Sequence, residues 1–157
     1  MKKIFLSTSF AGQVNHETRD ITPELRTSLE LILKALREQP DVEVFCAAEQ
    51  EGWKISDALP DNGVMRDITE IDTADIFVAL MHDKPSASVQ FEIGYAVGKG
   101  KKVVLAVKAG EELAYYNQGL VSGGLVTYVA YDDVKSLITQ LPIAINAPED
   151  LLAGASA

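Results

Sequence analysis

The 157-residue sequence predicts a single α/β domain built on a doubly wound parallel sheet of about five strands. Three observations support this prediction. Strand-like apolar segments alternate with segments of helical periodicity, which is typical of a parallel sheet covered by helices. The segment 76–81 is continuously apolar, as expected for a strand buried on both faces. The hydrophobic content of 47% and charged content of 24% are ordinary for a globular domain.

The first strand is expected at 3–7, followed by a loop at 8–21. A helix then begins at Thr22-Pro23, because a threonine caps free amides and a proline fits the first helical position. This helix ends before Pro40. Its inward face is expected to carry Leu25, Leu29, Ile32, Leu33 and Leu36.

The middle of the chain continues the alternation. A second strand is expected at 42–47, and Asn62-Gly63 precedes a helix at 64–73. The third strand is expected at 75–81 and the next helix at 89–98.

The last third predicts two more strands. They are expected at 102–107 and 125–130, with a short helix at 111–116 between them and a final helix at 133–141. We expect a domain at 1–145 and an alanine-rich tail at 146–157, with fraying after Pro142. Right-handed crossovers in this order favour the flavodoxin-like arrangement.

Composition excludes several classes of function. The net charge of −9 provides no basic stripe for a nucleic-acid backbone. No apolar run approaches the ~20 residues that cross a bilayer, so no membrane partner is expected. Cys46 is the only cysteine and is expected to be buried, which favours a reducing, cytoplasmic location.

Glu92 is the first candidate for chemistry. Most helix glutamates are solvated surface groups, but three apolar neighbours, Phe91, Ile93 and Tyr95, favour partial burial here. Ser88 is a natural helix cap, yet a capping box would need an acid where Phe91 stands, so capping does not explain Glu92. Burial raises the pKa of such a carboxyl and helix amides lower it, a balance that allows an ionised nucleophile at neutral pH.

Asp67 is the second candidate, with Asp72 and Asp75 as rivals. Asp75 directly precedes an apolar strand and is expected to satisfy loop amides, and Asp72 is expected to face water. Asp67 follows Arg66, so the alternative to a catalytic role is an ordinary surface ion pair of small energetic value.

Hydroxyl side chains follow two of the expected strands. Ser86 and Ser88 lie at a helix start, where free amides attract anions, and Ser7, Thr8 and Ser9 end the first strand. The two loops are expected to converge on one crevice, although such serines are also common as simple caps. The sequence contains no complete phosphate-binding glycine motif, and His16 and His82 lack the spacing of zinc ligands.

The segment 65–107 resembles the nucleoside 2-deoxyribosyltransferase superfamily, which includes deoxyribosyltransferases and nucleoside 5′-monophosphate N-glycosidases. The residues that carry the resemblance are Arg66, Asp67, Ala74, Asp75, Pro85, Ser86, Ser88, Phe91, Glu92, Gly94, Tyr95, Ala96, Gly100 and Lys101. The resemblance implies that Glu92 is a nucleophile attacking C1′ of the sugar and that Asp67 holds the base and assists its departure. It implies no metal or organic cofactor, and a nucleoside or nucleotide as the small-molecule partner. Water as the acceptor gives hydrolysis, and a second nucleobase gives transfer.

Two positions bear on the substrate and one on the assembly. Ser86 stands where the transferases have an aspartate and resembles the monophosphate N-glycosidases, whose serines receive the 5′-phosphate. The first-strand loop, however, lacks the arginine of the animal monophosphate hydrolases. Asn117 stands where family members lend a polar residue to a neighbouring subunit, which implies a homodimer or a higher homo-oligomer.

Other readings remain open at this point. One is a nucleotide-binding sensor that keeps the crevice without the chemistry, which the missing arginine favours. Another is an enzyme similar to TIR-type hydrolases of NAD, against which the Glu92-Ile93-Gly94-Tyr95 sequence argues. Trp53 is a candidate for stacking on a base, although packing is an equally ordinary use of tryptophan.

Overall fold

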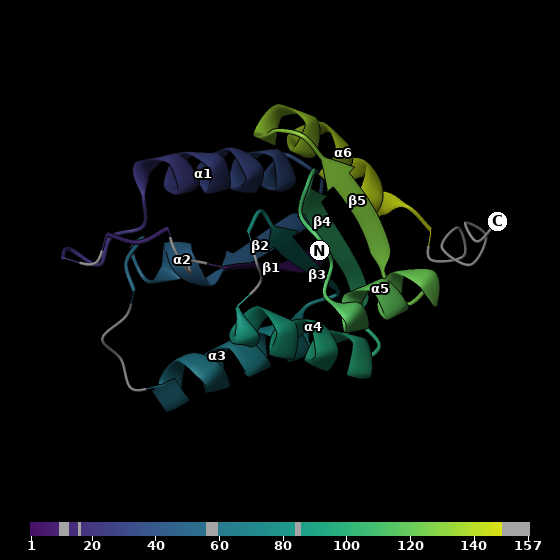
Figure 1. Cartoon of the computed structure of the whole chain (residues 1–157). Coiled ribbons are helices and arrows are strands. Elements are labelled where there is room, and N and C mark those ends of the chain that lie inside the picture. Colours follow the sequence, from purple (N-terminus) through teal and green to yellow (C-terminus); the bar gives the residue numbers. More distant parts are fainter. Residues whose placement is uncertain (10–12, 16, 56–59, 84–85, 149–157) are drawn as a thin grey trace.

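The computed structural model of the chain describes residues 1–9, 13–15, 17–55, 60–83 and 86–148. Its centre is a five-stranded parallel sheet with the strand order β2-β1-β3-β4-β5 (Figure 1). The strands are β1 (Lys2–Thr8), β2 (Val42–Cys46), β3 (Ile76–Met81), β4 (Lys102–Lys108) and β5 (Thr127–Tyr131). This order reverses between β1 and β3, as in the flavodoxin-like fold, and the predicted fold class is confirmed.

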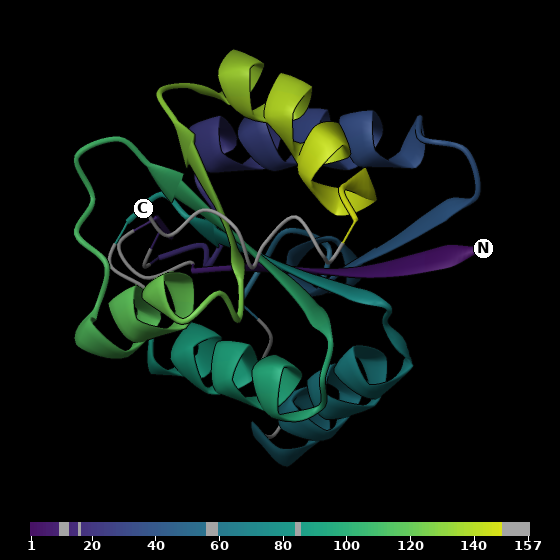
Figure 2. The ribbon, with the colours of Figure 1, turned by 90° about the vertical axis from the view of Figure 1, so that its right-hand side faces the viewer.

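The helices cover both faces of the sheet. They are α1 (Pro23–Arg37), α2 (Ala47–Gln50), α3 (Pro60–Thr73), α4 (Ala87–Gly98), α5 (Tyr115–Ser122) and α6 (Val134–Asn146). The helices α1 and α6 lie over one face, and α3, α4 and α5 lie over the other (Figures 1 and 2). Each face has its own hydrophobic core, so the sheet is buried on both sides.

The central strand β3 is buried along its whole length. Phe77 has no exposed surface and stacks on Phe5 of β1, with ring centroids 5.5 Å apart. At the start of the strand, Asp75 Oδ2 accepts a hydrogen bond of 2.7 Å from the backbone N–H of Lys3. Asp75 therefore satisfies a backbone amide beside the strand, as expected from its position.

The helix α1 begins as the sequence predicts. The Thr22 hydroxyl accepts a hydrogen bond from the backbone N–H of Leu25, and Pro23 occupies the first turn. The five apolar residues predicted for its inner face are all buried: Leu25, Leu29, Ile32, Leu33 and Leu36.

Several element boundaries differ from the predictions. The helix α3 begins at Pro60 rather than at residue 64, and α5 occupies Tyr115–Ser122 rather than 111–116. The chain also forms the short helix α2 directly after β2, where the prediction extended the strand through residue 47. Sequence propensity alone did not locate these boundaries, because tertiary packing determines where short helices begin and end.

The last helix, α6, continues through Pro142 to Asn146, so the expected fraying after Pro142 is wrong. A proline inside a helix removes one hydrogen bond and costs about 3 kcal/mol. Two features offset that cost. Ser136 and Asp133 form a capping box at the start, and the turn after Pro142 buries Ala144 and Ile145 against the core.

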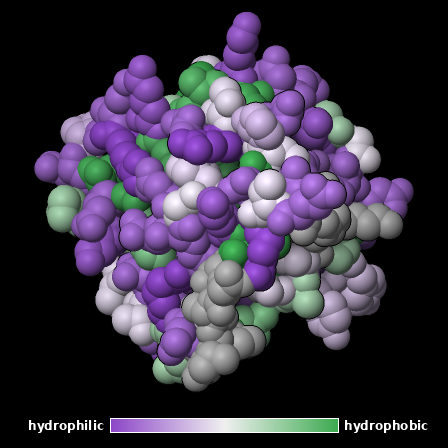
Figure 3. Space-filling model, turned by 90° about the vertical axis from the view of Figure 1, so that its left-hand side faces the viewer, coloured by the Kyte–Doolittle hydropathy of each residue, from purple (hydrophilic) through white to green (hydrophobic). Residues whose placement is uncertain are grey.

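The domain boundary at residue 145 stays a prediction, and 149–157 of the expected tail lie outside the described residues. Pro85, Phe10 and His16 also lie outside them. No helix in the described ranges is both long and apolar enough to span a membrane. One side of the molecule, seen in Figure 3, is mostly hydrophilic, with hydrophobic residues in small separate areas.

Candidate active site

A cavity of about 180 Å³ lies where β1 and β3 end, at the point where the strand order reverses. We call it the Glu92 cavity. It is lined by Phe5, Leu6, Ser7, Thr8, Ala47, Ala48, Glu51, Arg66, Asp67, Ser86, Ser88, Val89 and Glu92. Parallel sheets bind their ligands at such reversal points, beyond the carboxyl ends of the strands.

A second, more apolar cavity of about 380 Å³ adjoins it. It is lined by Val64, Asp67, Ile68, Ile71, Ala87, Ser88, Phe91 and Glu92. Asp67, Ser88 and Glu92 line both cavities, so a ligand can place a polar part in one and an apolar part in the other. Together the volumes are in the range of small-molecule sites, which is about 300–1,000 Å³.

Glu92 projects from the second turn of α4 into the Glu92 cavity. The Ser7 hydroxyl donates a hydrogen bond of 2.6 Å to Glu92 Oε2. Burial raises the pKa of Glu92 from 4.5 to about 7; the Ser7 hydroxyl opposes that rise, nearby Asp67 adds to it, and Arg66 opposes it. Partial burial was predicted correctly, but at neutral pH the carboxyl of the free protein is divided between its acid and its carboxylate.

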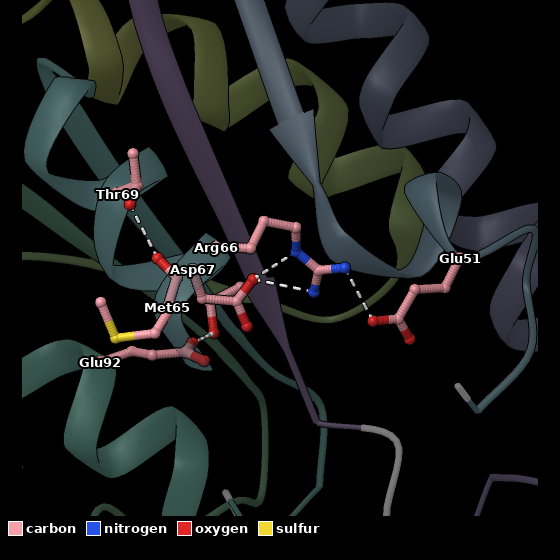
Figure 4. Close-up of polar contacts among 7 residues, drawn as sticks. Glu51, Met65, Arg66, Asp67, Thr69 and Glu92 are labelled. Carbon is pink, nitrogen blue, oxygen red and sulfur yellow. Dashed lines mark hydrogen bonds and ion pairs between the residues drawn. The ribbon is translucent and has the colours of Figure 1, made fainter. Parts of the chain in front are cut away.

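Asp67 lies on α3 and faces the same cavity. Its Oδ1 accepts hydrogen bonds from Arg66 Nε at 3.0 Å and Arg66 Nη2 at 2.9 Å (Figure 4). Arg66 Nη1 in turn lies 2.9 Å from Glu51 Oε1. Burial raises the pKa of Asp67, the bonds from Arg66 oppose that rise, and the charges of Glu51 and Glu70 add to it. The ion pair with Arg66 was foreseen, but it forms inside the cavity rather than on the surface.

The cap of α4 is Ser86, not Ser88. The Ser86 hydroxyl accepts a hydrogen bond of 3.3 Å from the backbone N–H of Val89. The helix starts at Ala87, two residues earlier than predicted, which moves Ser88 into the first turn and leaves it exposed. Both serines line the Glu92 cavity. With either serine as the cap, Glu92 is not the acid of a capping box.

The hydroxyls at the end of β1 divide between the two faces of the sheet. Successive residues of a strand point to opposite sides. Ser7 therefore reaches Glu92, whereas the Thr8 hydroxyl lies 3.5 Å from His82 Nδ1, although Thr8 also lines the cavity. Ser9 is buried, and its hydroxyl has no hydrogen-bond partner among the described residues.

Asn117 lies on α5 and is buried, with 1% of its surface exposed. Its Nδ2 has no hydrogen-bond partner within the described part of the chain. It is not among the described residues that line either cavity. A role for Asn117 at a neighbouring subunit's site therefore stays a prediction.

The other acids and aromatics take structural places. Asp72 accepts hydrogen bonds from the Tyr95 hydroxyl and pairs with Lys99 at the surface, both at 2.9 Å. Trp53 packs against the core under α1, and Arg26 lies 5.3 Å from the centre of its ring. Neither Asp72 nor Trp53 is among the described residues lining the Glu92 cavity. In the described ranges, no three histidine, cysteine or acidic side chains are placed to hold a metal ion.

Glu51 is the residue of the cavity that the sequence did not reveal. It follows the short helix α2, which was itself missed, and it is far from Arg66 along the chain. A lone glutamate in a loop carries no signal of a role in a site. Only the fold brings it against the guanidinium of Arg66.

Comparisons with known proteins identify the family of the chain. Over residues 16–144 the chain matches the family model described as nucleoside 2-deoxyribosyltransferase. BlsM, known from a solution structure, shares 28% identity over 99% of this chain and 98% of its own, with a TM-score of 0.76. The CMP N-glycosidase BcmB of Clostridium botulinum shares 24% identity over 90% and 99% of the two chains, with a TM-score of 0.66.

The 2-deoxyribosyltransferase of Bacillus psychrosaccharolyticus has the same fold, with a TM-score of 0.60 and 19% identity over 96% of this chain and 95% of its own. No curated protein matches the chain. The match to the family model covers most of the sequence and includes both Asp67 and Glu92. The chain belongs to the nucleoside 2-deoxyribosyltransferase family.

Proposed function

We propose that the protein cleaves the N-glycosidic bond of a nucleoside, a deoxynucleoside or a 5′-monophosphate of either, through a covalent intermediate on Glu92. The observation that carries this proposal is the placement of two half-buried carboxyl groups, Glu92 and Asp67, in one cavity. A double displacement at a sugar carbon needs one carboxylate nucleophile and one proton donor.

In the first step, an oxygen of ionised Glu92 bonds to C1′ while the bond from C1′ to the base breaks. The electron pair of that bond goes to the base, which takes a proton from Asp67. The Ser7 hydrogen bond favours the ionised form of Glu92, and burial favours the protonated form of Asp67. Burial favours the protonated form of Glu92 as well, so the reactive form of the enzyme is the one in which Glu92 is ionised and Asp67 carries a proton.

In the second step, the acceptor attacks C1′ and the bond to Glu92 breaks. Water gives the free sugar, and a nucleobase gives a new nucleoside. Asp67, now ionised, takes the proton that the acceptor releases, which restores the starting state. No step requires a metal or an organic cofactor.

The main test is incubation with a panel of nucleosides and 5′-monophosphates, with and without a free base, followed by chromatography of the bases. We expect base release, base exchange or both, and a loss of at least about 100-fold in Glu92→Ala and in Asp67→Asn. No turnover of any panel member, together with tight binding in calorimetry, would favour a nucleotide sensor instead. Release of nicotinamide from NAD alone would favour the NAD hydrolase reading.

We also propose that Ser86 receives the 5′-phosphate when the substrate is a nucleotide. Its hydroxyl lies at the amino terminus of α4, where free amides and the helix dipole attract an anion. Ser86→Asp is a sharp test, because aspartate caps a helix as well as serine does but repels a phosphate. We expect it to lower kcat/KM for a monophosphate at least about tenfold more than for the matching nucleoside. Equal losses would contradict phosphate recognition at Ser86.

Two further proposals concern the setting of the reaction. We propose a cytoplasmic enzyme that works as a homodimer or a higher homo-oligomer, with Asn117 serving the site of a neighbouring subunit. The buried Nδ2 of Asn117 has no hydrogen-bond partner among the residues that the structure describes, which supports this proposal. Sedimentation analysis of the protein and of Asn117→Ala would test the oligomeric state. Activity assays of both proteins would test the role of Asn117.

A further inference from the structure

The guanidinium of Arg66 is held between two carboxylates. Nη1 lies 2.9 Å from Glu51 Oε1, while Nε and Nη2 donate to Asp67 Oδ1 at 3.0 and 2.9 Å (Figure 4). The three side chains are only 31%, 19% and 21% exposed for Arg66, Glu51 and Asp67. Arg66 also lies 5.7 Å from the ring centre of Phe45, so one face of the guanidinium rests on an aromatic ring.

This arrangement creates a problem for the proposed chemistry. An arginine beside a carboxylate favours the ionised form, and an ionised Asp67 has no proton to give to a departing base. Without Arg66 the ionised form of Asp67 would be less favoured, but Arg66 lines the Glu92 cavity. The second carboxylate of the cluster offers a physical solution.

We propose that Glu51 is a positioning residue that draws the charge of Arg66 away from Asp67, so that Asp67 keeps its proton for the leaving base. This inference rests on the proposed function, and it assigns to Glu51 a role in the same site. Glu51 pairs with the Nη1 side of the guanidinium, so the positive charge of Arg66 is shared between two carboxylates. Its negative charge also acts on Asp67 directly.

The charged and titratable groups that face Asp67 come from every element packed around it. Arg66 and Glu70 share its helix α3, Glu51 follows α2, and Glu92 comes from α4 and is itself bonded by Ser7 of β1. Arg66 opposes the rise of the Asp67 pKa, whereas Glu51 and Glu70 support it. Glu51 is the one of these supporting groups that is ion-paired to Arg66.

The test compares two variants that should shift the pKa of Asp67 in opposite directions. Glu51→Gln removes a negative charge and frees Arg66 to pair fully with Asp67, so the pKa of Asp67 should fall. Arg66→Met removes the opposing cation, so the pKa of Asp67 should rise. The measurement is the titration of the Asp67 side-chain carbon by NMR in the free protein, which requires no substrate and no turnover.

The control is Glu49→Gln. Glu49 lies on α2, just before Glu51, and pairs with Arg37, with 2.9 Å between Glu49 Oε1 and Arg37 Nη1, but it is not among the described residues that line the Glu92 cavity. It should leave the Asp67 titration unchanged. Glu51→Ser is a second neutral replacement and should repeat the direction of Glu51→Gln, in case the glutamine variant does not fold.

Activity supplies the second readout. If the proposed function holds, Glu51→Gln should lower kcat at neutral pH about three- to tenfold and move the alkaline limb of the kcat profile to lower pH, with a smaller effect on KM. An Asp67 titration that is unchanged in Glu51→Gln, or that moves the same way in Glu51→Gln and Arg66→Met, would overturn the inference. A protein without turnover would contradict the proposed function, and the NMR titration would still decide the role of Glu51.

Discussion

The raised pKa of Glu92 makes the stability of the protein depend on pH in a way that a single substitution removes. Burial in the cavity disfavours the carboxylate, so the folded protein holds a proton on Glu92 up to a pH of about 7. The unfolded chain loses that proton near 4.5. Between these values unfolding releases a proton, and the free energy of unfolding falls as pH rises.

The size of the effect follows from the two values. Each pH unit between 4.5 and about 7 corresponds to about 1.4 kcal/mol. The whole interval amounts to at most about 3 to 4 kcal/mol, and we expect about 2 to 3 kcal/mol because the side chain retains some solvent contact. Glu92→Gln has no such titration. It should match the parent in stability below pH 4.5 and exceed it by that amount above pH 7.

The assay is urea unfolding of both proteins at a series of pH values from 4 to 8.5, followed by circular dichroism. A difference of 2 to 3 kcal/mol moves the midpoint by about 1 M urea. Glu112→Gln, at an exposed position in a protein of net charge −9, controls for the general relief of charge repulsion. A gain in Glu92→Gln that is constant across pH, or no larger than that of Glu112→Gln, would refute the burial argument.

Four further outcomes follow from the environments of single residues. The activity of the parent should rise with pH through about 7, as Glu92 ionises, and a flat profile in pH–rate measurements would argue against Glu92 as the nucleophile. Ser7→Ala removes the hydrogen bond that favours the Glu92 carboxylate, so that rise should move to higher pH and the rate at pH 7 should fall about tenfold. Asp75→Ala should leave the pH dependence of the reaction rate unchanged. It should lower the free energy of unfolding by about 1 kcal/mol in urea, because the hydrogen bond from the Lys3 amide is lost. Phe77→Ala should cost about 3–5 kcal/mol in the same assay because the ring is fully buried, and a loss below 1 kcal/mol would contradict its place in the core.

Periodicity and turn chemistry were enough to predict the sheet and the main helices. The apolar face of α1 gave its position because that periodicity is specific to a helix, and the run in β3 was identified as a strand because it is short and continuously apolar. The start of α3, both ends of α5 and the end of α6 were wrong. At Pro142 the local rule predicts a stop, and burial of the following turn overrides it.

The site was predictable only as far as its residues are close in sequence or carry a family pattern. Glu92 and Asp67 do share one cavity, and Ser7 does contact Glu92. Thr8 was grouped with Ser7, but the pleat of the strand turns its hydroxyl toward His82. The contact of Glu51 with Arg66 could not be read from the sequence, because it exists only after α2 and α3 are packed.

Because Ser7 and Thr8 point to opposite faces of the sheet, β1 does not tolerate insertions or deletions of a single residue. Deleting one residue of β1 before Phe5 would exchange the two faces, placing Thr8 beside Glu92 and Ser9 beside His82 and turning core residues such as Phe5 to the other layer. Inserting one residue there would place the apolar Leu6 beside Glu92. Length changes before Ser7 are therefore expected to be eliminated by selection, even when they preserve composition. Length variation among relatives should instead accumulate after residue 9, where the strand has ended.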